Sequence, residues 1–508
     1  MLSCIKSAGI SGLNGYEVII EADYGPGLPS FSLVGLPDAA VKESYDRVRS
    51  AIKNSGFTFP SGKLVVNLAP ANTRKEGPIY DLAIAVALLS VTNQINSRAF
   101  HNTAFIGELS LNGDIKPVNG VLPMSIDLRN NGIKNLVIPK ANAEEASHID
   151  GLNIYAFKNL KELVLHANGI ERINPCIKSQ FNPSNITNTT VDMCSIKGQE
   201  QAKRAIEISV TGGHNILFIG PPGSGKTMLA KAAAGILPEL TFEEALEITK
   251  IHSVCGELNS GIITSRPYRS PHHSTSIAAL TGGGKNAGPG EVSLAHGGVL
   301  FLDELPEFKR EVLESLRQPL EDGVISVARV NAKYTYPARF MLIASMNPCP
   351  CGHFGDPTVK CTCTPAQISK YRSKISGPFL DRIDLHIEVS RPDYNNLVSK
   401  ANLETSESIK NRINNTREMI NERFKNTTVY SNADMTQQQF EKFCKPDKNG
   451  GKLLKNAFET LNLSARSYKR ILLVSRTIAD LDLSETIKSE HIAEAIQYRS
   501  LDRKYWGT

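Results

Sequence analysis

The stretch NILFIGPPGSGKT, residues 215–227, joins a short apolar run directly to a glycine-rich loop. The loop matches the pattern GxxxxGK[ST], and a helix-forming stretch follows over residues 228–237. Glycines let successive backbone N–H groups turn toward a phosphate, and the start of the next helix adds its positive end. We therefore predict a nucleotide-binding loop in which Lys226 reaches the β and γ phosphates and Thr227 ligates Mg²⁺. The phosphate-binding residues are Gly220, Pro221, Pro222, Gly223, Ser224, Gly225, Lys226 and Thr227.

A second apolar run, residues 298–302, ends in Asp303 and Glu304. Ligands of α/β sheets bind at the carboxyl ends of the strands, where these two carboxylates would emerge. We expect Asp303 to hold Mg²⁺ through water and Glu304 to polarise the attacking water. An apolar run that ends in two acids is often an ordinary strand end. Its place after a phosphate-binding loop favours a catalytic pair.

A third apolar run, residues 340–346, is followed by Asn347. An amide at this position can orient the lytic water beside the γ-phosphate, and its alternative role is an ordinary cap. Three such strands alternating with helical stretches predict a doubly wound α/β domain with a parallel sheet.

The rest of the N-terminal half is organised differently. Residues 1–165 read as a mixed α/β domain, in which strand-like runs such as 17–21 and 64–68 alternate with amphipathic stretches. Residues 172–192 are rich in Asn, Thr, Ser and Pro, so we assign a linker over 166–195.

The ATPase core is predicted over residues 196–391 and a helical lid over 392–508. Strand-like runs stop at about residue 392, and helical periodicity takes over. The periodic stretches are residues 406–424, 452–482 and 486–498.

The bulk composition is that of an ordinary globular protein. With 508 residues, the chain is too long for one hydrophobic core. It has no apolar run long enough to span a bilayer and no N-terminal apolar segment of the secretory type. Nine scattered cysteines favour reduced thiols, so we expect a cytoplasmic protein without a membrane partner. The net charge of +6 is compatible with a polyanion partner, although a solvated basic face is the commoner explanation.

These features resemble the AAA+ superfamily, in particular its magnesium-chelatase-like branch. Over essentially the full length, the chain is similar to the ComM/YifB family of bacterial proteins. The family-specific stretches, in order, are GLPDAAVKES (residues 35–44), KGQEQAKR (197–204), YRSPHHS (268–274), NPCPCG (347–352) and SGPFLDRID (376–384). The resemblance implies a homo-hexameric motor that uses ATP and Mg²⁺ and acts on single-stranded or branched DNA. It also implies branch migration of joint molecules during natural transformation.

The resemblance assigns two further residues. Arg382 matches the family's arginine finger, which reaches the γ-phosphate bound by the neighbouring subunit. Arg466 matches the lid arginine (sensor 2), which contacts the nucleotide of its own subunit. Spacing alone leaves both open as ordinary surface arginines.

Residues 1–165 resemble the proteolytic domain of Lon, an α+β domain of the ribosomal S5 domain 2-like fold, through GELSLNGDIKPVNG over residues 107–120. Ile79 stands where Lon-type proteases carry the nucleophilic serine, and no lysine follows residue 120 at the expected place. Serine attack needs a hydroxyl and a nearby base, so we expect no peptidase activity. A scaffold for oligomerisation or DNA contact is the better interpretation, by analogy with the fold.

Four cysteines cluster directly after Asn347, as two C-x-C pairs separated by nine residues: Cys349, Cys351, Cys361 and Cys363. Four thiols at this spacing predict a tetrahedral Zn²⁺ site, with His353 as an alternative ligand and unligated thiols as the other interpretation. The tandem His272 and His273 is a weaker metal candidate, and we interpret it as structural or DNA-facing.

The leading functional hypothesis is a DNA-remodelling ATPase. By resemblance, residues 255–280 and a β-hairpin over 323–339 would face a central pore. Arg329, Lys333 and Tyr334 give that hairpin a basic and aromatic character suited to nucleic acid, although ordinary strand residues would look similar. The alternatives are a magnesium-chelatase-type motor subunit, against which the Lon-like domain speaks, and a regulatory ATPase that acts on protein partners.

Overall fold

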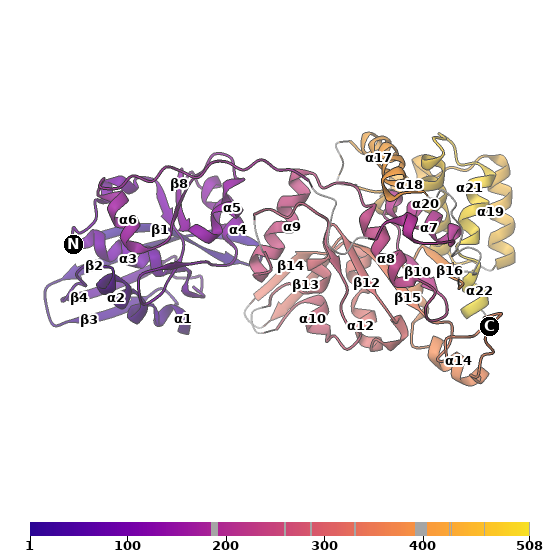
Figure 1. The fold of residues 1–508 in the computed structure, drawn as a ribbon, viewed down its shortest axis with the longest axis horizontal. Coiled ribbons are helices and arrows are strands. Elements are labelled where there is room, and N and C mark those ends of the chain that lie inside the picture. The colour runs from indigo at the N-terminus through magenta and orange to yellow at the C-terminus, as the bar shows by residue number, and fades with distance from the viewer. Residues whose placement is uncertain are drawn as a thin grey trace. The chain divides into compact units, whose positions relative to one another are not determined.

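The structure is a computed structural model, which describes residues 1–183, 191–258, 261–284, 287–329, 332–391, 404–425, 427, 429–461 and 463–506. Two compact units make up the chain (Figure 1). The first comprises Met1–Asn182 and Thr241–Thr264, and the second comprises Pro183–Leu240 and Ser265–Thr508. Part of the predicted linker, residues 184–190, lies outside the described residues.

The first unit is built on a mixed sheet with the strand order β3-β4-β2-β1-β5-β8-β9. Its strands are β1 (Leu2–Ser11), β2 (Asn14–Gly25), β3 (Ser30–Val34), β4 (Lys63–Ala69), β5 (Thr103–Phe105), β8 (Asn135–Pro139) and β9 (Asn153–Phe157). A separate two-stranded sheet pairs β6 (Glu108–Leu109) with β7 (Ile115–Lys116). The antiparallel pairs are β1 with β2 and β2 with β4, and the other neighbours in the large sheet are parallel.

Both faces of this sheet are covered, because successive side chains of a strand point to opposite faces. Ile5 of β1 and Phe105 of β5 join one buried cluster, whereas Ala8 and Ala104 join another. Helix α3 packs on β1 and β2 at the face that holds the first cluster, and α4 packs on the same strands at the face that holds the second (Figure 1). The helices are α1 (Ala39–Lys42), α2 (Ser44–Asn54), α3 (Asp81–Val91), α4 (Val121–Asn130), α5 (Ala143–Ser147), α6 (Leu160–Ala167) and α9 (Phe242–Cys255).

Helix α9 is separated in sequence from the rest of the first unit but is anchored to it by buried hydrogen bonds. The Gly120 amide donates to the Ser253 carbonyl at 3.0 Å, and the Ser253 hydroxyl donates to the Glu145 carboxylate. The Leu122 amide donates to the same carboxylate at 2.8 Å. Residues 241–264 lie within the expected ATPase core in sequence, yet they pack with the N-terminal unit.

The second unit is built on a five-stranded parallel sheet with the order β11-β12-β15-β10-β16. Its strands are β10 (Ile216–Ile219), β11 (Tyr268–Arg269), β12 (Val299–Leu302), β15 (Met341–Met346) and β16 (Leu385–Glu388). All residues of β10, β12 and β15 are buried, which explains why they read as continuous apolar runs in the sequence. The predicted parallel sheet is confirmed, with each of these three strands beginning one residue later than expected.

Helices flank this sheet, and one β-hairpin accompanies it. The helices before residue 392 are α7 (Glu200–Gly212), α8 (Lys226–Gly235), α10 (Ile277–Thr281), α11 (Glu291–Leu294), α12 (Arg310–Ser315), α13 (Arg317–Asp322), α14 (Pro365–Arg372) and α15 (Gly377–Leu380). The hairpin consists of β13 (Val324–Arg329) and β14 (Ala332–Pro337).

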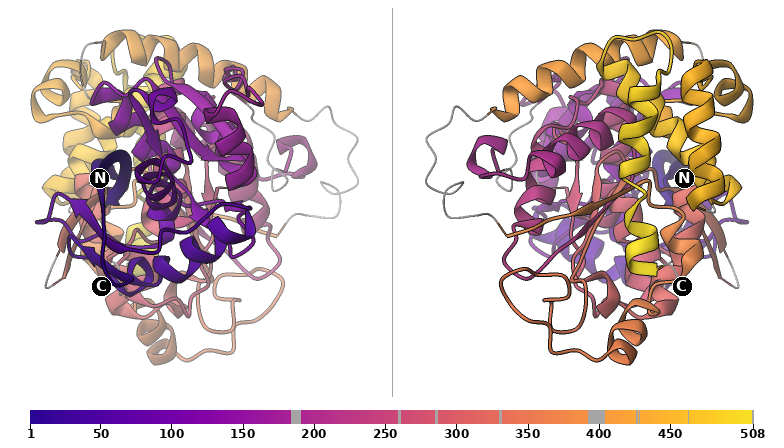
Figure 2. Two further views of the ribbon diagram at one scale, coloured as in Figure 1. Left: turned by 90° about the vertical axis from the view of Figure 1, so that its left-hand side faces the viewer. Right: turned by 90° about the vertical axis from the view of Figure 1, so that its right-hand side faces the viewer.

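The predicted helical C-terminal region is also confirmed, and Figure 2 shows its helices, coloured orange to yellow, lying together. They are α17 (Ser406–Arg423), α18 (Gln437–Phe443), α19 (Lys448–Leu461), α20 (Ala465–Leu481), α21 (Ser489–Gln497) and α22 (Leu501–Trp506). The stretch 452–482, expected as continuous helical periodicity, is two helices. Ser464 starts the second, because its hydroxyl accepts a hydrogen bond from the Ser467 amide at 3.1 Å.

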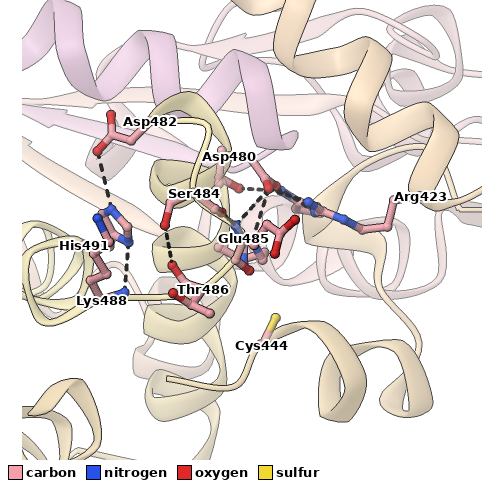
Figure 3. Close-up of polar contacts among 12 residues, drawn as sticks. Arg423, Cys444, Asp480, Asp482, Ser484, Glu485, Thr486, Lys488 and His491 are labelled. Carbon is pink, nitrogen blue, oxygen red and sulfur yellow. Dashed lines mark hydrogen bonds and ion pairs between the residues drawn. The ribbon is translucent and has the colours of Figure 1, made fainter. Parts of the chain in front are cut away.

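A buried acid holds the helical region together. Asp480 of α20 pairs with Arg423 of α17 and with Arg476 one turn before it, as Figure 3 shows for Arg423 and Asp480. The Asn432 side chain donates to the same carboxylate at 2.8 Å. Two cations and an amide therefore compensate one buried charge. No described helix combines the length and the apolar content that a bilayer crossing requires.

Candidate functional site

Three neighbouring parallel strands end at the same edge of the second sheet, and the predicted nucleotide residues follow them. Strand β15 lies between β12 and β10, with Leu302 opposite Ala344 and Ile219 opposite Met346. The glycine-rich loop, the pair of acids and Asn347 therefore meet at one place, as the sequence predicted for the carboxyl ends of parallel strands.

The loop between β10 and α8 needs glycine for conformation and for space. Gly223 and Gly225 have φ values of 76° and 91°, which disfavour residues with a Cβ. A Cβ on Gly220 would lie 2.1 Å from the Val389 carbonyl oxygen, so no larger residue fits there. The loop leads into the N-terminus of α8, where backbone N–H groups and the helix dipole favour an anion.

Lys226 is buried at the centre of this loop. Its Nζ donates to the carbonyl oxygens of Gly220 at 2.7 Å and Pro221 at 2.9 Å, and to Asn347 Oδ1 at 3.2 Å. Burial lowers the pKa of Lys226 to about 8, although the nearby charges of Asp303 and Glu304 raise it. A phosphate would supply the counter-charge that this ammonium group needs.

Thr227 and Asp303 fit a Mg²⁺ ion. The Thr227 hydroxyl lies 3.2 Å from Asp303 Oδ2, so a hydroxyl and a carboxylate oxygen converge as hard ligands for this cation. Ser345 of β15 donates its hydroxyl hydrogen to Asp303 Oδ1, and the Glu304 amide donates to the same oxygen at 3.0 Å. Sequence reasoning missed Ser345. A hydroxyl two residues before Asn347 in an otherwise apolar strand was the available signal.

Glu304 lies beside the histidine tandem. Its backbone has a φ of 52°, in the left-handed region, and its carboxylate lies 3.8 Å from His273 Nδ1. The rings of His272 and His273 lie 4.0 Å apart between centroids. The tandem that the sequence suggested as structural or DNA-facing therefore reaches the expected water-activating residue, which spacing alone did not reveal.

Arg382 and Arg466 meet at a single acid, Glu321 of α13. Arg382 is 3% exposed, and its guanidinium lies 2.6 Å from Glu321 Oε2 and donates to the Pro378 carbonyl at 2.5 Å. Arg466 pairs with Glu321 Oε1. The structure brings the two arginines together, but it pairs both within one chain. Their assigned roles toward nucleotide remain predictions, and Glu321 was not foreseen.

The four predicted cysteines converge. Their four Sγ atoms all lie within 4.8 Å of one another, and none of the four cysteines forms a disulfide. Cys349 Sγ lies 3.4 Å from Cys351 Sγ and 3.7 Å from Cys361 Sγ. Four thiolates around one Zn²⁺, at about 2.3 Å each, would stand about 3.8 Å apart, so the donor set fits this metal. His353 instead faces Asp356, with its Nδ1 3.4 Å from the carboxylate.

The cysteine loop touches the nucleotide loop. Gly352 has a φ of 82°, and a Cβ there would lie 2.5 Å from Pro222 Cδ. Arg372 of α14 donates to the Pro348 carbonyl at 3.2 Å, and its guanidinium lies over the rings of Phe354 and Tyr505 at 4.7 Å each. These contacts hold the loop against the nucleotide-binding edge.

The hairpin expected over residues 323–339 is present as β13 and β14. Lys333 is exposed opposite Ala328, and the next residue, Tyr334, points to the other face of the strand. The Tyr334 ring lies 6.2 Å from that of Tyr336, whose hydroxyl donates to the Ala287 carbonyl at 2.7 Å. The tip, residues 330–331, and the side chain of Arg329 lie outside the described part of the chain. So do residues 259–260 of the other predicted insert.

In the first unit, the segment that resembles a protease site is occupied by apolar and ion-paired residues. Ile79 lies in a short 3₁₀ turn, Pro78–Tyr80, and Val121 begins α4. The next residue after the turn, Asp81, is buried and pairs with Arg47 at 2.7 Å. Burial raises the pKa of Asp81 to about 6, although Arg47 lowers it.

Comparisons with known proteins cover nearly the whole chain. Family models match for magnesium chelatase, subunit ChlI (residues 192–397), subunit ChlI of Mg-chelatase (20–142), and the C-terminal part of magnesium chelatase subunit ChlI (403–499). The chain is 43% identical to the competence protein ComM of Haemophilus influenzae over 507 residues, which cover 99% of this chain and 98% of that protein. It is 41% identical to the uncharacterised protein YifB of Escherichia coli, with the same two coverages.

A partial similarity concerns the N-terminal region. The chain is 29% identical to the Lon protease of Treponema pallidum over 147 residues, which are 27% of this chain and 16% of that protein.

Proposed function

Because the chain belongs to the ComM/YifB family of magnesium-chelatase-like AAA+ proteins, we propose that it is an ATP-driven motor that remodels DNA. Its reaction would be branch migration of recombination intermediates during natural transformation. A DNA substrate would place this activity in the cytoplasm. The observation that carries the ATPase assignment is the convergence of Lys226, Asp303 and Asn347 at one sheet edge.

The residues present are suited to ATP hydrolysis. Thr227 and Asp303 would hold Mg²⁺, which would neutralise charge on the phosphate oxygens. Lys226 would exchange its carbonyl contacts for the β and γ phosphates. Glu304 would accept a proton from water, and Asn347 would orient that water beside the γ-phosphate.

The arginines support an assembled motor. In a homo-hexamer, Arg382 of one subunit would reach the γ-phosphate of its neighbour, and Arg466 would contact the nucleotide of its own subunit. An arginine supplied by a neighbour can contribute about 10³ to 10⁵ in rate.

The hairpin supports a nucleic-acid partner. Lys333 is exposed on β14, and lysine contacts phosphates without regard to base sequence. Tyr334 offers a ring on which an unpaired base can stack. We propose single-stranded or branched DNA as the substrate class.

We also propose that Cys349, Cys351, Cys361 and Cys363 hold one structural Zn²⁺. The support is the spacing of the sulfurs, which suits a tetrahedral ion. Such an ion would fix the loop whose Gly352 contacts Pro222 of the nucleotide-binding loop.

The proposal is tested by the ATPase rate with single-stranded, duplex, forked and four-way DNA at two salt concentrations. We expect forked, four-way or single-stranded DNA to raise the rate, and higher salt to reduce that effect because phosphate contacts release counterions. Lys226→Ala controls for contaminating ATPases. A rate unchanged by every DNA would contradict the DNA assignment. If a protein fraction raises the rate instead, the regulatory ATPase is favoured. If a metal-insertion partner raises the rate, the chelatase motor is favoured.

A further inference from the structure

Glu321 of α13 pairs with both Arg382 and Arg466 and lies directly before the β13–β14 hairpin. We propose that Glu321 is a positioning residue: it holds both arginines away from nucleotide and ties their release to the β13–β14 hairpin. The inference rests on the proposed function for the identity of what the arginines and the hairpin bind.

Each carboxylate oxygen of Glu321 serves a different guanidinium. Oε2 lies 2.6 Å from Arg382, and Oε1 pairs with Arg466. The two arginines come from distant parts of the sequence, the turn after α15 and the start of α20. A single side chain of α13 therefore links the predicted finger to the predicted lid arginine.

Carboxylate and phosphate oxygens compete for the same partner. A guanidinium presents a planar fork of N–H donors that fits either anion in the same manner. An arginine paired with Glu321 is therefore unavailable to a phosphate until the pair opens. Arg382 is 3% exposed, and its Nε has no hydrogen-bond partner among the described residues. The Arg382 guanidinium therefore keeps a free donor while it is held in a buried position.

Glu321 is also placed at the root of the hairpin. Helix α13 ends at Asp322, and Gly323, with a φ of 64°, turns the chain directly into β13. The Gly323 amide donates to Pro319 within α13 at 3.0 Å, and its carbonyl accepts from Ala338 just after β14 at 2.8 Å. One residue thus joins the helix to both strands, so a force on the hairpin reaches Glu321 over two residues of chain.

The helix is braced on its other side by the segment that carries Arg382. In α12, Glu314 accepts a hydrogen bond from the Ser376 hydroxyl at 2.5 Å and pairs with Arg317 of α13 at 3.0 Å. Ser376 caps α15, which directly precedes Arg382. Glu314 therefore joins the start of α13 to the segment that carries Arg382. If the end of α13 moves with the hairpin while this segment stays in place, the distance between Glu321 and Arg382 changes.

The first test measures nucleotide affinity without DNA, using a fluorescent non-hydrolysable ATP analogue. Glu321→Gln should lower its Kd by about two- to fivefold, the range that a half-exposed ion pair contributes. Asp322→Asn is the matched control, since it removes the same charge from the next residue and should leave the Kd unchanged. In a chain that carries Arg382→Gln and Arg466→Gln, adding Glu321→Gln should have no effect. An unchanged Kd in Glu321→Gln, or a drop that persists without the arginines, would overturn the proposal.

The second test measures the ratio of the ATPase rate with forked DNA to the rate without it. In Glu321→Gln this ratio should fall several-fold toward one, because the arginines are already released without any movement of the hairpin. Asp322→Asn should keep the parent's ratio. If no DNA stimulates the parent protein, the proposed function is contradicted. The Kd measurement would still test whether Glu321 holds the two arginines away from nucleotide. A stimulated parent with equal stimulation in Glu321→Gln would overturn the link to the hairpin.

Discussion

At the scale of single residues, nucleotide binding and hydrolysis should be separable. Lys226 lies in the phosphate-binding loop, whereas Glu304 follows β12 and, among the described residues, makes no hydrogen bond to that loop. We expect Lys226→Ala to lose ATP binding, because phosphate charge is then unmatched, and Glu304→Gln to bind ATP without cleaving it. Equilibrium binding and phosphate release, measured on the same preparations, check both statements. Normal turnover in Glu304→Gln would remove Glu304 from its assigned role.

The pH dependence of ATP binding follows from the burial of Lys226. Burial lowers the pKa of Lys226 to about 8, so the nucleotide-free protein loses this proton as the pH rises from 7 to 9. Phosphate favours the charged ammonium, so ATP binding at high pH must take up a proton. We therefore expect the affinity for ATP to fall above about pH 8, by at most about tenfold per pH unit for one proton.

Lys226→Arg is the matched control for this titration. A guanidinium keeps its charge throughout the range, so its affinity, although weaker, should show no fall centred near pH 8. Calorimetry in two buffers of different ionisation enthalpy would count the proton taken up. A parent whose affinity follows the same pH curve as Lys226→Arg would contradict the assignment.

Residues were predictable where the sequence places them next to the strand that positions them. Lys226, Asp303 and Asn347 each lie within a few residues of a buried apolar run, and all three meet as expected. Ser345 contacts Asp303, and His273 contacts Glu304, through pairings between separate elements. Glu321 contacts Arg382 and Arg466 in the same way. Such contacts depend on strand register and helix packing, which local composition does not encode.

At the scale of elements, the hairpin makes the sharpest prediction about DNA. Lys333→Ala should weaken binding to all DNA sequences and flatten its dependence on salt, because one phosphate contact per subunit is lost. Tyr334→Ala should weaken binding by roughly 1–3 kcal/mol per stacked base while keeping the slope. The two side chains leave β14 on opposite faces, so their effects should be separable. Fluorescence anisotropy over a salt series measures both quantities.

A lysine elsewhere controls for general charge loss. Lys455 of α19 is exposed and only loosely paired with Glu459, at 4.0 Å, so Lys455→Ala should keep the parent's affinity and slope. If all three variants behave alike, the hairpin is not the contact surface. The segment around Arg266, Arg269 and His272 would then be the next candidate.

The cysteine loop predicts a metal that supports nucleotide binding. Purified protein should contain about one zinc per chain, and Cys361→Ser should lose it because three thiolates no longer close the tetrahedron. Since Gly352 of this loop touches Pro222, the same variant should also bind ATP more weakly. Elemental analysis and ATP titration measure the two effects.

Cys4→Ser serves as the control, because Cys4 is an exposed free cysteine in the other unit. It should leave both the zinc content and ATP affinity unchanged. Protein prepared without chelators that contains no metal would make the four cysteines structural thiols.

Element types were easier to predict than element partners. The buried strands of the second unit read directly as apolar runs. The break before Ser464 in the stretch 452–482 was missed, because apolar periodicity continues on both sides and masks the N-cap signal of Ser464 itself. Helix α9 is the clearer case. Its sequence neighbours belong to the region expected as the ATPase core, whereas the buried contacts of Ser253 with Glu145 and Gly120 assign it to the first unit.

At the scale of the whole molecule, the question is whether one chain can complete its own site. Arg382→Ala alone should hydrolyse ATP poorly. Mixing it with Lys226→Ala should restore activity, since an intact loop from one variant can then face an intact Arg382 from the other. With equal amounts and random assembly, about a quarter of the subunit interfaces would contain both parts. ATPase activity against mixing ratio measures this recovery.

The outcome also bears on Glu321. In a single chain Arg382 is buried against Glu321, so reaching a neighbour's phosphate requires that ion pair to open. Recovery on mixing would mean that assembly supplies the free energy to open it, and adding Glu321→Gln to the Lys226→Ala partner should then increase the recovered rate. If no mixing ratio restores activity while each variant still assembles, Arg382 acts within its own chain. Its contact with Glu321 would then be part of the working site rather than a state that assembly must undo.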